Sequence, residues 1–241
     1  MPVDRYFLDS DFDVEHVYSI EGPEHHHLAH VVRGKEGGVI DLVNGRGYLA
    51  HARIQKLGRR NVDVCVEGVD YQEREGFRMI LAQAMPRANR LDTILEKVTE
   101  LGVTEIRLFP GERSEKRKRS ENVDRMRSVL ISAMKQSGRL YIPDLVLKGE
   151  IGEWDQLEGK GYFGDISEGA PLFEDAWKGD KPKGEAVFVV GPESGFSERE
   201  EGLLREKGFV GVKLSDAILR TDTAPIMALS LVHHWVLRDK R

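Results

Sequence analysis

Two short segments of the chain combine residue types that could bind a ligand and stabilise charge. The first, GPESGFS at 191–197, follows an apolar run and precedes a helical pattern. Gly191 and Gly195 permit positive φ and close approach of the backbone to a ligand, and Pro192 stiffens the turn. The helix start that follows offers unpaired N–H groups, and Glu193 adds a carboxylate. The alternative is an ordinary connection whose glycines only shape a bend.

The second segment, LSDAILRTDTAP at 214–225, also lies between an apolar run and a helical pattern. It presents one cation, Arg220, among hydroxyls and small residues. Because a guanidinium keeps its proton, Arg220 can stabilise developing negative charge or bind a carboxylate. Thr221 and Thr223 have an alternative role as caps of the last helix.

Other familiar sites fail on spacing. A nucleophile elbow reads Gly-x-Ser-x-Gly, but Pro192 and Phe196 stand at the two glycine positions around Ser194. This argues against a small-molecule hydrolase. The chain contains neither a Gly-Lys-Ser/Thr phosphate loop nor a Gly-x-Gly-x-x-Gly turn after a strand. His26 and His30 have helical i, i+4 spacing without the glutamate of a His-Glu-x-x-His site, and Cys65 is the single cysteine. We therefore expect no metal, and surface packing or an RNA contact for these histidines.

The first 70 residues read as short strands separated by glycine turns. Strands are expected at 5–8, 39–43, 48–54 and 61–69, with an Asn44-Gly45 hairpin signal and one short helix at 24–32. This pattern predicts a small β-barrel domain. A charged stretch without periodicity at 71–76 is the expected linker.

From residue 77 onward, strands alternate with helices. Strands are expected at 78–84, 106–109, 162–166, 186–190 and 209–214. Helices are expected at 91–101 after Asn89, at 122–136, from a Ser197–Glu200 capping box to Gly208, and at 225–237. This alternation predicts an α/β domain with a parallel sheet. Ligands bind such sheets at the carboxyl ends of the strands, where we expect both the 191–197 and the 214–225 segments to lie.

Charge is unevenly distributed along the chain. The 241 residues include 36 Lys and Arg against 41 Asp and Glu, and the net charge of -5 argues mildly against a nucleic-acid binder. Residues 76–150, however, hold 15 basic and 10 acidic side chains, and 107–139 hold ten and four. Local positive potential attracts a phosphate backbone, so the distribution points to RNA, with a solvated surface as the alternative.

The single cysteine and the absence of an apolar run of 18 residues favour a cytoplasmic protein without a membrane span. The first ten residues show no signal-peptide pattern.

Together the motifs resemble the RsmE family, SPOUT-class enzymes that methylate N3 of a uridine in bacterial 16S ribosomal RNA. The resemblance rests on the paired segments 191–197 and 214–224, and on MPR at 85–87, LDTILEKVTELG at 91–102, ERS at 112–114, QSGR at 136–139, RYF at 5–7 and the stretch from His27 to Arg33. The chain departs from the family at Ser194 and Asp222, where Gly and Glu are usual, and in FGDISE at 163–168.

The resemblance implies a fold and an activity. It implies a PUA-like β-barrel RNA-binding domain at 1–72, followed at 73–241 by an α/β SPOUT domain whose parallel sheet carries a deep trefoil knot. Such folds are rare exceptions to unknotted topology. The implied cofactor is S-adenosyl-L-methionine, and the implied partner is 16S rRNA, presented on the small ribosomal subunit. A homodimer through the last helix is also implied.

The resemblance and the charge chemistry together assign the site. Arg220 and Glu193 are the expected catalytic residues. The expected cofactor contacts, Glu193 among them, are Asp165, Ile166, Gly191, Pro192, Gly195, Leu214, Ser215, Ile218, Leu219, Thr221, Thr223 and Ala224. The expected RNA contacts are Arg5, His27, Arg33, Arg87, Arg113, Lys116, Arg117, Lys118, Arg119 and Arg139. A non-catalytic RNA-binding or ribosome-assembly factor, and a SPOUT methyltransferase with another RNA target, remain as alternatives.

Overall fold

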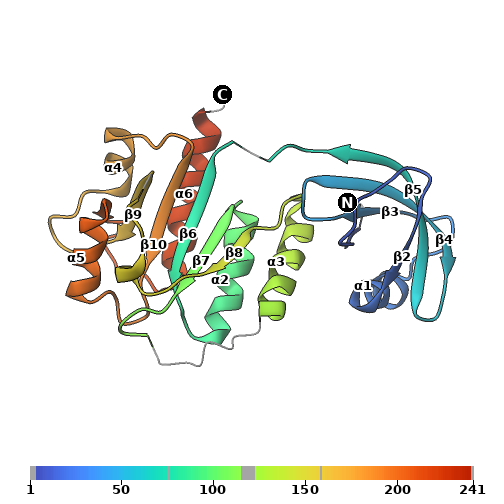
Figure 1. The fold of residues 1–241 in the computed structure, drawn as a ribbon, viewed down its shortest axis with the longest axis horizontal. Coiled ribbons are helices and arrows are strands. Elements are labelled where there is room, and N and C mark those ends of the chain that lie inside the picture. Colours follow the sequence, from blue (N-terminus) through green and yellow to red (C-terminus); the bar gives the residue numbers. More distant parts are fainter. Residues whose placement is uncertain (1–3, 75, 115–122, 158, 240–241) are drawn as a thin grey trace. The chain divides into compact units, whose positions relative to one another are not determined.

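The computed structural model describes residues 4–74, 76–114, 123–157 and 159–239 (Figure 1). The chain divides into two compact units. The first comprises Met1–Arg74 and Ile131–Ile142, and the second comprises Glu75–Leu130 and Pro143–Arg241. The segment Ile131–Ile142 belongs to the first unit because its Met134 and Leu140 pack against Val43 in a small apolar cluster.

The first unit contains a five-stranded sheet. Its strands are β1 (Arg5–Phe7), β2 (Val17–Glu21), β3 (Val39–Val43), β4 (Tyr48–Leu57) and β5 (Asn61–Tyr71), in the order β1-β3-β4-β5-β2. Only the β1–β3 pair is parallel among these neighbours. Alternate residues of β5 are buried, as expected of a sheet with one face on a core. The expected hairpin joins β3 to β4, and Asn44 accepts the amide of Arg46 at 2.9 Å in its turn.

The helix expected at 24–32 consists of two elements. An α-helix, α1 (Gly22–His26), continues into a π-helix over His27–Val32, which ends at Arg33 in the left-handed conformation. His25 of α1 and Leu28 of the π-helix are buried, whereas His27 is exposed.

The second unit contains a six-stranded sheet in the order β11-β9-β10-β6-β7-β8. Its strands are β6 (Arg78–Ala84), β7 (Glu105–Phe109), β8 (Asp144–Leu147), β9 (Lys160–Gly164), β10 (Glu185–Val190) and β11 (Phe209–Val212). Every neighbouring pair is parallel, which confirms the α/β prediction. The strand expected to reach Ile166 stops at Gly164, because Asp165 turns its carboxylate back to the Ser167 amide.

In the described part of the chain from residue 76 onward, the helices that connect or follow these strands are α2 (Ala88–Glu100), α3 (Val123–Ser137), α4 (Phe173–Gly179), α5 (Glu198–Glu206) and α6 (Thr223–Asp239), with a 3-10 turn at Ile151–Glu153. Helix α3 runs on into the first unit's segment. The Ser197–Glu200 capping box opens α5 as expected. Helix α2 begins at Ala88, so Asn89 lies within it and Arg87 is its N-cap residue. Asn122 lies outside the described residues.

Side chains of the central strands alternate between two apolar layers. Tyr162 of β9 packs against Phe173 of α4, in an aromatic cluster that reaches Trp235 of α6. The adjacent Phe163 faces the opposite layer and packs against Phe196, on the side of α5. Because both faces of the sheet are covered, ligands can approach these strands at their ends (Figure 1).

Candidate functional site

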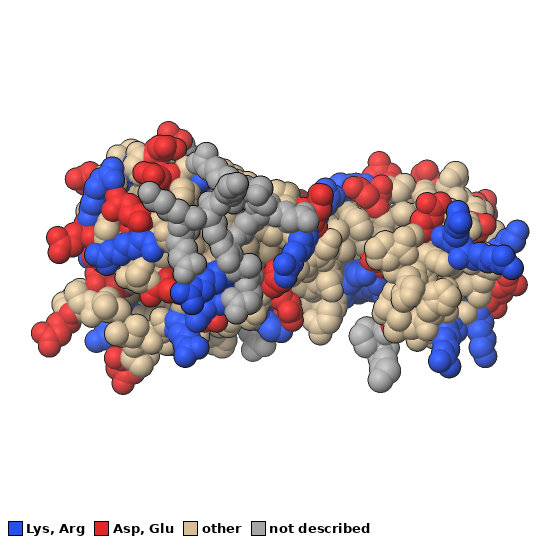
Figure 2. Space-filling view, turned by 90° about the horizontal axis from the view of Figure 1, so that it is seen from below, with Lys and Arg blue, Asp and Glu red and all other residues tan. Residues whose placement is uncertain are grey.

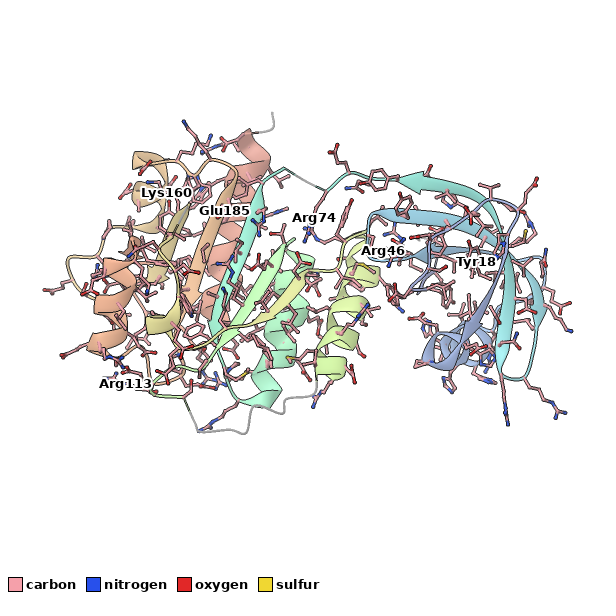
Figure 3. All side chains as sticks on the ribbon, in the orientation of Figure 1. Tyr18, Arg46, Arg74, Arg113, Lys160 and Glu185 are labelled. Atoms are coloured by element: carbon pink, nitrogen blue, oxygen red, sulfur yellow. The ribbon has the colours of Figure 1, made fainter. Side chains whose placement is uncertain are left out.

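A cavity of about 590 Å³ lies at the carboxyl ends of the neighbouring strands β9, β10 and β11. Three loops line it, at 164–166, 191–196 and 214–221. Figure 3 shows Arg113, which also lines the cavity, at this edge of the sheet, whereas Lys160 and Glu185 begin their strands at the opposite edge. The two segments singled out from the sequence therefore meet in one cavity.

The first of these segments, at 191–197, is held by one hydrogen bond within it and two to Arg113. Gly195 adopts φ +74°, which favours glycine, and its amide bonds the Pro192 carbonyl at 2.9 Å. Ser194 donates to the Arg113 carbonyl at 3.0 Å, while the Arg113 guanidinium donates to the Ser194 carbonyl at 3.4 Å. Ser194 is thus engaged in holding a neighbouring loop.

The second segment packs directly against the first. Thr221 is buried, and its hydroxyl donates to the Gly191 carbonyl at 2.9 Å. Ser215 accepts the Ala217 amide at 3.1 Å, which shapes the start of the loop. Ile218 at the loop tip is 81% exposed although it lines the cavity, so part of its apolar surface faces outward.

Carboxylates dominate the charge of the cavity wall. Asp165, Glu193, Glu198 and Glu201 line it, against the single cation Arg113 among the described residues. Burial raises the pKa of Glu201, and the nearby charge of Asp165 adds to that effect. Burial also opposes ionisation of Asp165, but hydrogen bonds from Ser167 and Arg205 hold its pKa below the ordinary value. The wall therefore favours a positively charged ligand.

Glu193 and Arg220 occupy different settings. Glu193 accepts the Arg87 amide at 3.2 Å, and its Oε1 lies 3.8 Å from Nε of Arg90. Arg220 is exposed and stands between two cavity residues, Leu219 and Thr221. No described side chain hydrogen-bonds the exposed Arg220 guanidinium.

The residues that line the cavity lie in a part of the chain that matches a known protein family. A family model described as an RNA methyltransferase domain matches residues 73–233, more than half of the chain. The chain belongs to this RNA methyltransferase family. A second model, described as an RNA methyltransferase PUA domain, matches residues 20–67 in the first unit. Together with the relatives below, these matches confirm the resemblance stated from the sequence.

Similar proteins carry the name of the same enzyme. The chain is 28% identical over 250 residues to "Ribosomal RNA small subunit methyltransferase E" of Bacillus subtilis, covering 95% of this chain and 96% of that protein. The crystal structure of the Neisseria gonorrhoeae protein of that name, bound to S-adenosyl methionine, is 29% identical and superposes with a TM-score of 0.86 over 97% of this chain and 98% of that one. A Legionella pneumophila structure in complex with SAM is 25% identical, with a TM-score of 0.87 over 98% of each chain.

In this methyltransferase, most of the expected cofactor contacts line one cavity. They are Asp165, Ile166, Gly191, Pro192, Glu193, Gly195, Leu214, Ser215, Ile218, Leu219, Thr221 and Ala224. Thr223 is not among the lining residues; it is exposed, and its amide bonds the Arg220 carbonyl at 2.9 Å at the start of α6.

The expected RNA contacts fall in both units. In the first unit, His27 and Arg33 are exposed, whereas Nη1 of Arg5 is buried close to Gly138 and Arg139 is half-buried. In the methyltransferase domain, Arg87 is exposed and Arg113 lies at the cavity. Lys116, Arg117, Lys118 and Arg119 lie outside the described residues. On the face that Figure 2 shows, the described basic and acidic side chains are intermixed.

Four residues around the cavity were missed from the sequence. Arg90 contacts Glu193 and Asp222, Arg205 binds Asp165, Gln83 binds Thr221, and Glu201 lines the wall. Three of them read as ordinary helix residues. A glutamine inside the apolar run 78–84 was a visible signal, because a buried amide needs a partner.

Across the described ranges, no group of three or more His, Cys, Asp or Glu side chains is arranged to hold a metal ion. None of the helices in the described part of the chain has the length and apolar character needed to cross a bilayer.

Proposed function

We propose that this protein transfers a methyl group from S-adenosyl-L-methionine to N3 of one uridine in 16S rRNA. The observation that carries the proposal is the convergence of both family segments, 191–197 and 214–224, on one cavity at the carboxyl ends of parallel strands. The similarity to proteins named for small-subunit rRNA methylation, one of them crystallised with S-adenosyl methionine, supports the same reading.

The residues present fit this cofactor. A cavity of about 590 Å³ lies within the size range of small-molecule sites. Glycines and small side chains in its loops let main-chain groups approach an adenine, and the carboxylates of Asp165, Glu198 and Glu201 complement a sulfonium charge. When bound, the cofactor supplies an electrophilic methyl group on positively charged sulfur.

The uracil must lose its N3 proton to become a good nucleophile. A site for this reaction therefore has to stabilise negative charge on the uracil carbonyl oxygens. Arg220 suits that role, because its guanidinium keeps its charge and the residue stands in the loop that lines the cavity, between Leu219 and Thr221. Glu193 suits the orientation of its loop better than proton removal, since the Arg87 amide already occupies one of its oxygens.

RNA binding and assembly complete the proposal. Arg113, at the cavity, and the exposed His27 and Arg33 of the PUA-like unit are suited to phosphate or base contacts, as is the basic run 116–119. A homodimer through α6 would cover the exposed apolar side chains of the cavity loops. A knot that threads the 214–224 segment, and a cytoplasmic location beside the ribosome, belong to the same proposal.

The test combines binding with turnover. Calorimetry should detect micromolar binding of S-adenosylmethionine, and small subunits that lack the modification should accept labelled methyl groups. Salt-sensitive RNA binding without affinity for the cofactor would instead identify a non-catalytic RNA-binding factor.

A further inference from the structure

Residues 83–90, which span the end of β6, the connection and the first turn of α2, contact both cavity loops, and none of them is among the residues that line the cavity. Gln83, near the end of β6, is fully buried. Its Nε2 donates to Thr221 Oγ1 at 3.0 Å and to the Ala84 carbonyl at 3.0 Å. A strand in the middle of the sheet therefore bonds directly to the 214–224 segment.

The direction of these bonds is determined by the donors available. Thr221 has a single hydroxyl proton, which it donates to the Gly191 carbonyl. Its oxygen must therefore accept from Gln83, which requires the amide nitrogen to point toward it. Oε1 of Gln83 has no hydrogen-bond partner among the described residues. A polar chain thus runs from β6 through the second loop to the first, in buried surroundings where such bonds are strongest.

A second link joins the same parts nearer the surface. Glu193 of the first loop accepts the Arg87 amide at the N-cap of α2. Arg90, in the first turn of α2, lies 3.8 Å from Glu193 and 3.5 Å from Asp222 of the second loop. The first turn of α2 has no acidic residue of its own, and the Glu193 carboxylate, which binds the Arg87 amide, complements the positive end of the helix from outside it.

We propose that Gln83 and Arg90 are positioning residues that hold the two cavity loops in their relative positions before the ligand binds. The inference rests on the proposed function for the identity of the ligand, but the links themselves are independent of it. Loops held in place bind with less loss of freedom than loops that must be ordered on binding. Losing either link should therefore weaken cofactor binding and disturb methyl alignment, although neither side chain reaches the cavity.

Gln83→Met tests the inner link, because it keeps the shape of the side chain and removes the donor. Thr99→Val is a matched control: Thr99 is equally buried and donates to the Leu95 carbonyl within α2, away from both loops. We expect Gln83→Met to raise the Kd for S-adenosylmethionine about 5- to 10-fold, the effect of one hydrogen bond, and to lower kcat. Thr99→Val should change only the melting temperature.

A double-mutant cycle separates positioning from general destabilisation. In a Thr221→Val background the acceptor is gone, so adding Gln83→Met should change the Kd much less than it does in the natural sequence. Thr221→Ser keeps the hydroxyl and should preserve the full effect of Gln83→Met. Arg90→Lys should restore part of the binding lost in Arg90→Ala.

Hydrogen exchange without any ligand supplies the independent readout. Amides of 191–197 and 214–224 should exchange faster in Gln83→Met and in Arg90→Ala than in Thr99→Val. Unchanged exchange together with an unchanged Kd would overturn the proposal. If the natural protein binds no S-adenosylmethionine, the proposed function fails, while faster exchange would still support the links and unchanged exchange would refute them.

Discussion

Asp165, directly after β9, accepts a 2.5 Å hydrogen bond from Arg205 of α5. The Arg205 guanidinium also lies 5.0 Å from the centre of the Phe163 ring. A Cβ on Gly211 would come within 2.5 Å of the Asp165 carboxylate, so glycine is needed there for the pair to form. One wall of the cavity is therefore built around a charge pair that joins β9, β11 and α5.

Removing the cation of this pair should lower stability in a pH-dependent way. Arg205→Met is expected to reduce the free energy of unfolding by about 1–2 kcal/mol at pH 7, because a buried carboxylate loses its charged partner. The folded-state pKa of Asp165 lies below its unfolded value, so the contribution is present above about pH 4 and is lost as pH falls through the folded pKa. Urea unfolding at pH 7 and at the lowest pH that keeps the protein folded should show the difference shrink. A difference of equal size at both pH values would contradict this account.

Glu201 should behave in the opposite sense. Its folded-state pKa is raised, so its ionisation costs stability at neutral pH and that cost disappears as pH falls below the unfolded value. We expect Glu201→Gln to increase stability at pH 7 and to weaken binding of cationic S-adenosylmethionine more than binding of neutral S-adenosylhomocysteine. Calorimetry with both ligands measures this selectivity. Equal losses for the two ligands would show that the Glu201 charge does not act on the sulfonium.

The basic run at 116–119 should govern the salt dependence of RNA binding. Replacing Lys116, Arg117, Lys118 and Arg119 by glutamine is expected to reduce the slope of log K against log salt by up to about 3. A matched control replaces the same number of basic residues elsewhere in the chain, none of which lines the cavity: Lys160, Lys178, Lys181 and Lys183. The same reduction in both variants would assign the effect to total charge. An unchanged slope in the 116–119 variant would show that this run does not bind RNA and is only a solvated surface.

Arg220 is expected to act on turnover rather than on cofactor binding. Arg220→Ala should lower kcat about 10²- to 10³-fold, the usual effect of losing one preorganised donor at an oxyanion. The Kd for S-adenosylmethionine and the melting temperature should stay near their original values, since the side chain lies outside the cavity lining. Near-normal turnover on small subunits would exclude the assignment.

Local signals predicted the strands and caps that depend on few residues. The strand expected at 78–84 has the same first and last residues as β6, and Ser197 with Glu200 forms the expected capping box. Strand β8 was missed because its sequence, DLVL, has an apolar run of only three residues and no alternation, and at the sheet edge its residues are only half-buried or exposed. Helix α4 was missed because seven residues are too few to establish a period, although Phe173 and Trp177 share its buried face.

The cavity could be located from the sequence, but its supports could not. Glycine, proline and Arg220 mark the loops through their own chemistry. Gln83 and Thr221 are 138 positions apart in the sequence, and Arg90 and Asp222, which also contact each other, are 132 positions apart. Such contacts depend on the order of strands in the sheet, which the local pattern does not encode.

The most direct test of the central claim is mass-spectrometric mapping of 16S rRNA. Small subunits from a strain that lacks the gene would be incubated with S-adenosylmethionine and either the natural protein or Arg220→Ala. We predict one new methyl group, on N3 of a single uridine, with the natural protein and almost none with the variant. A methyl group on another atom or another RNA, or none at all, would contradict the account.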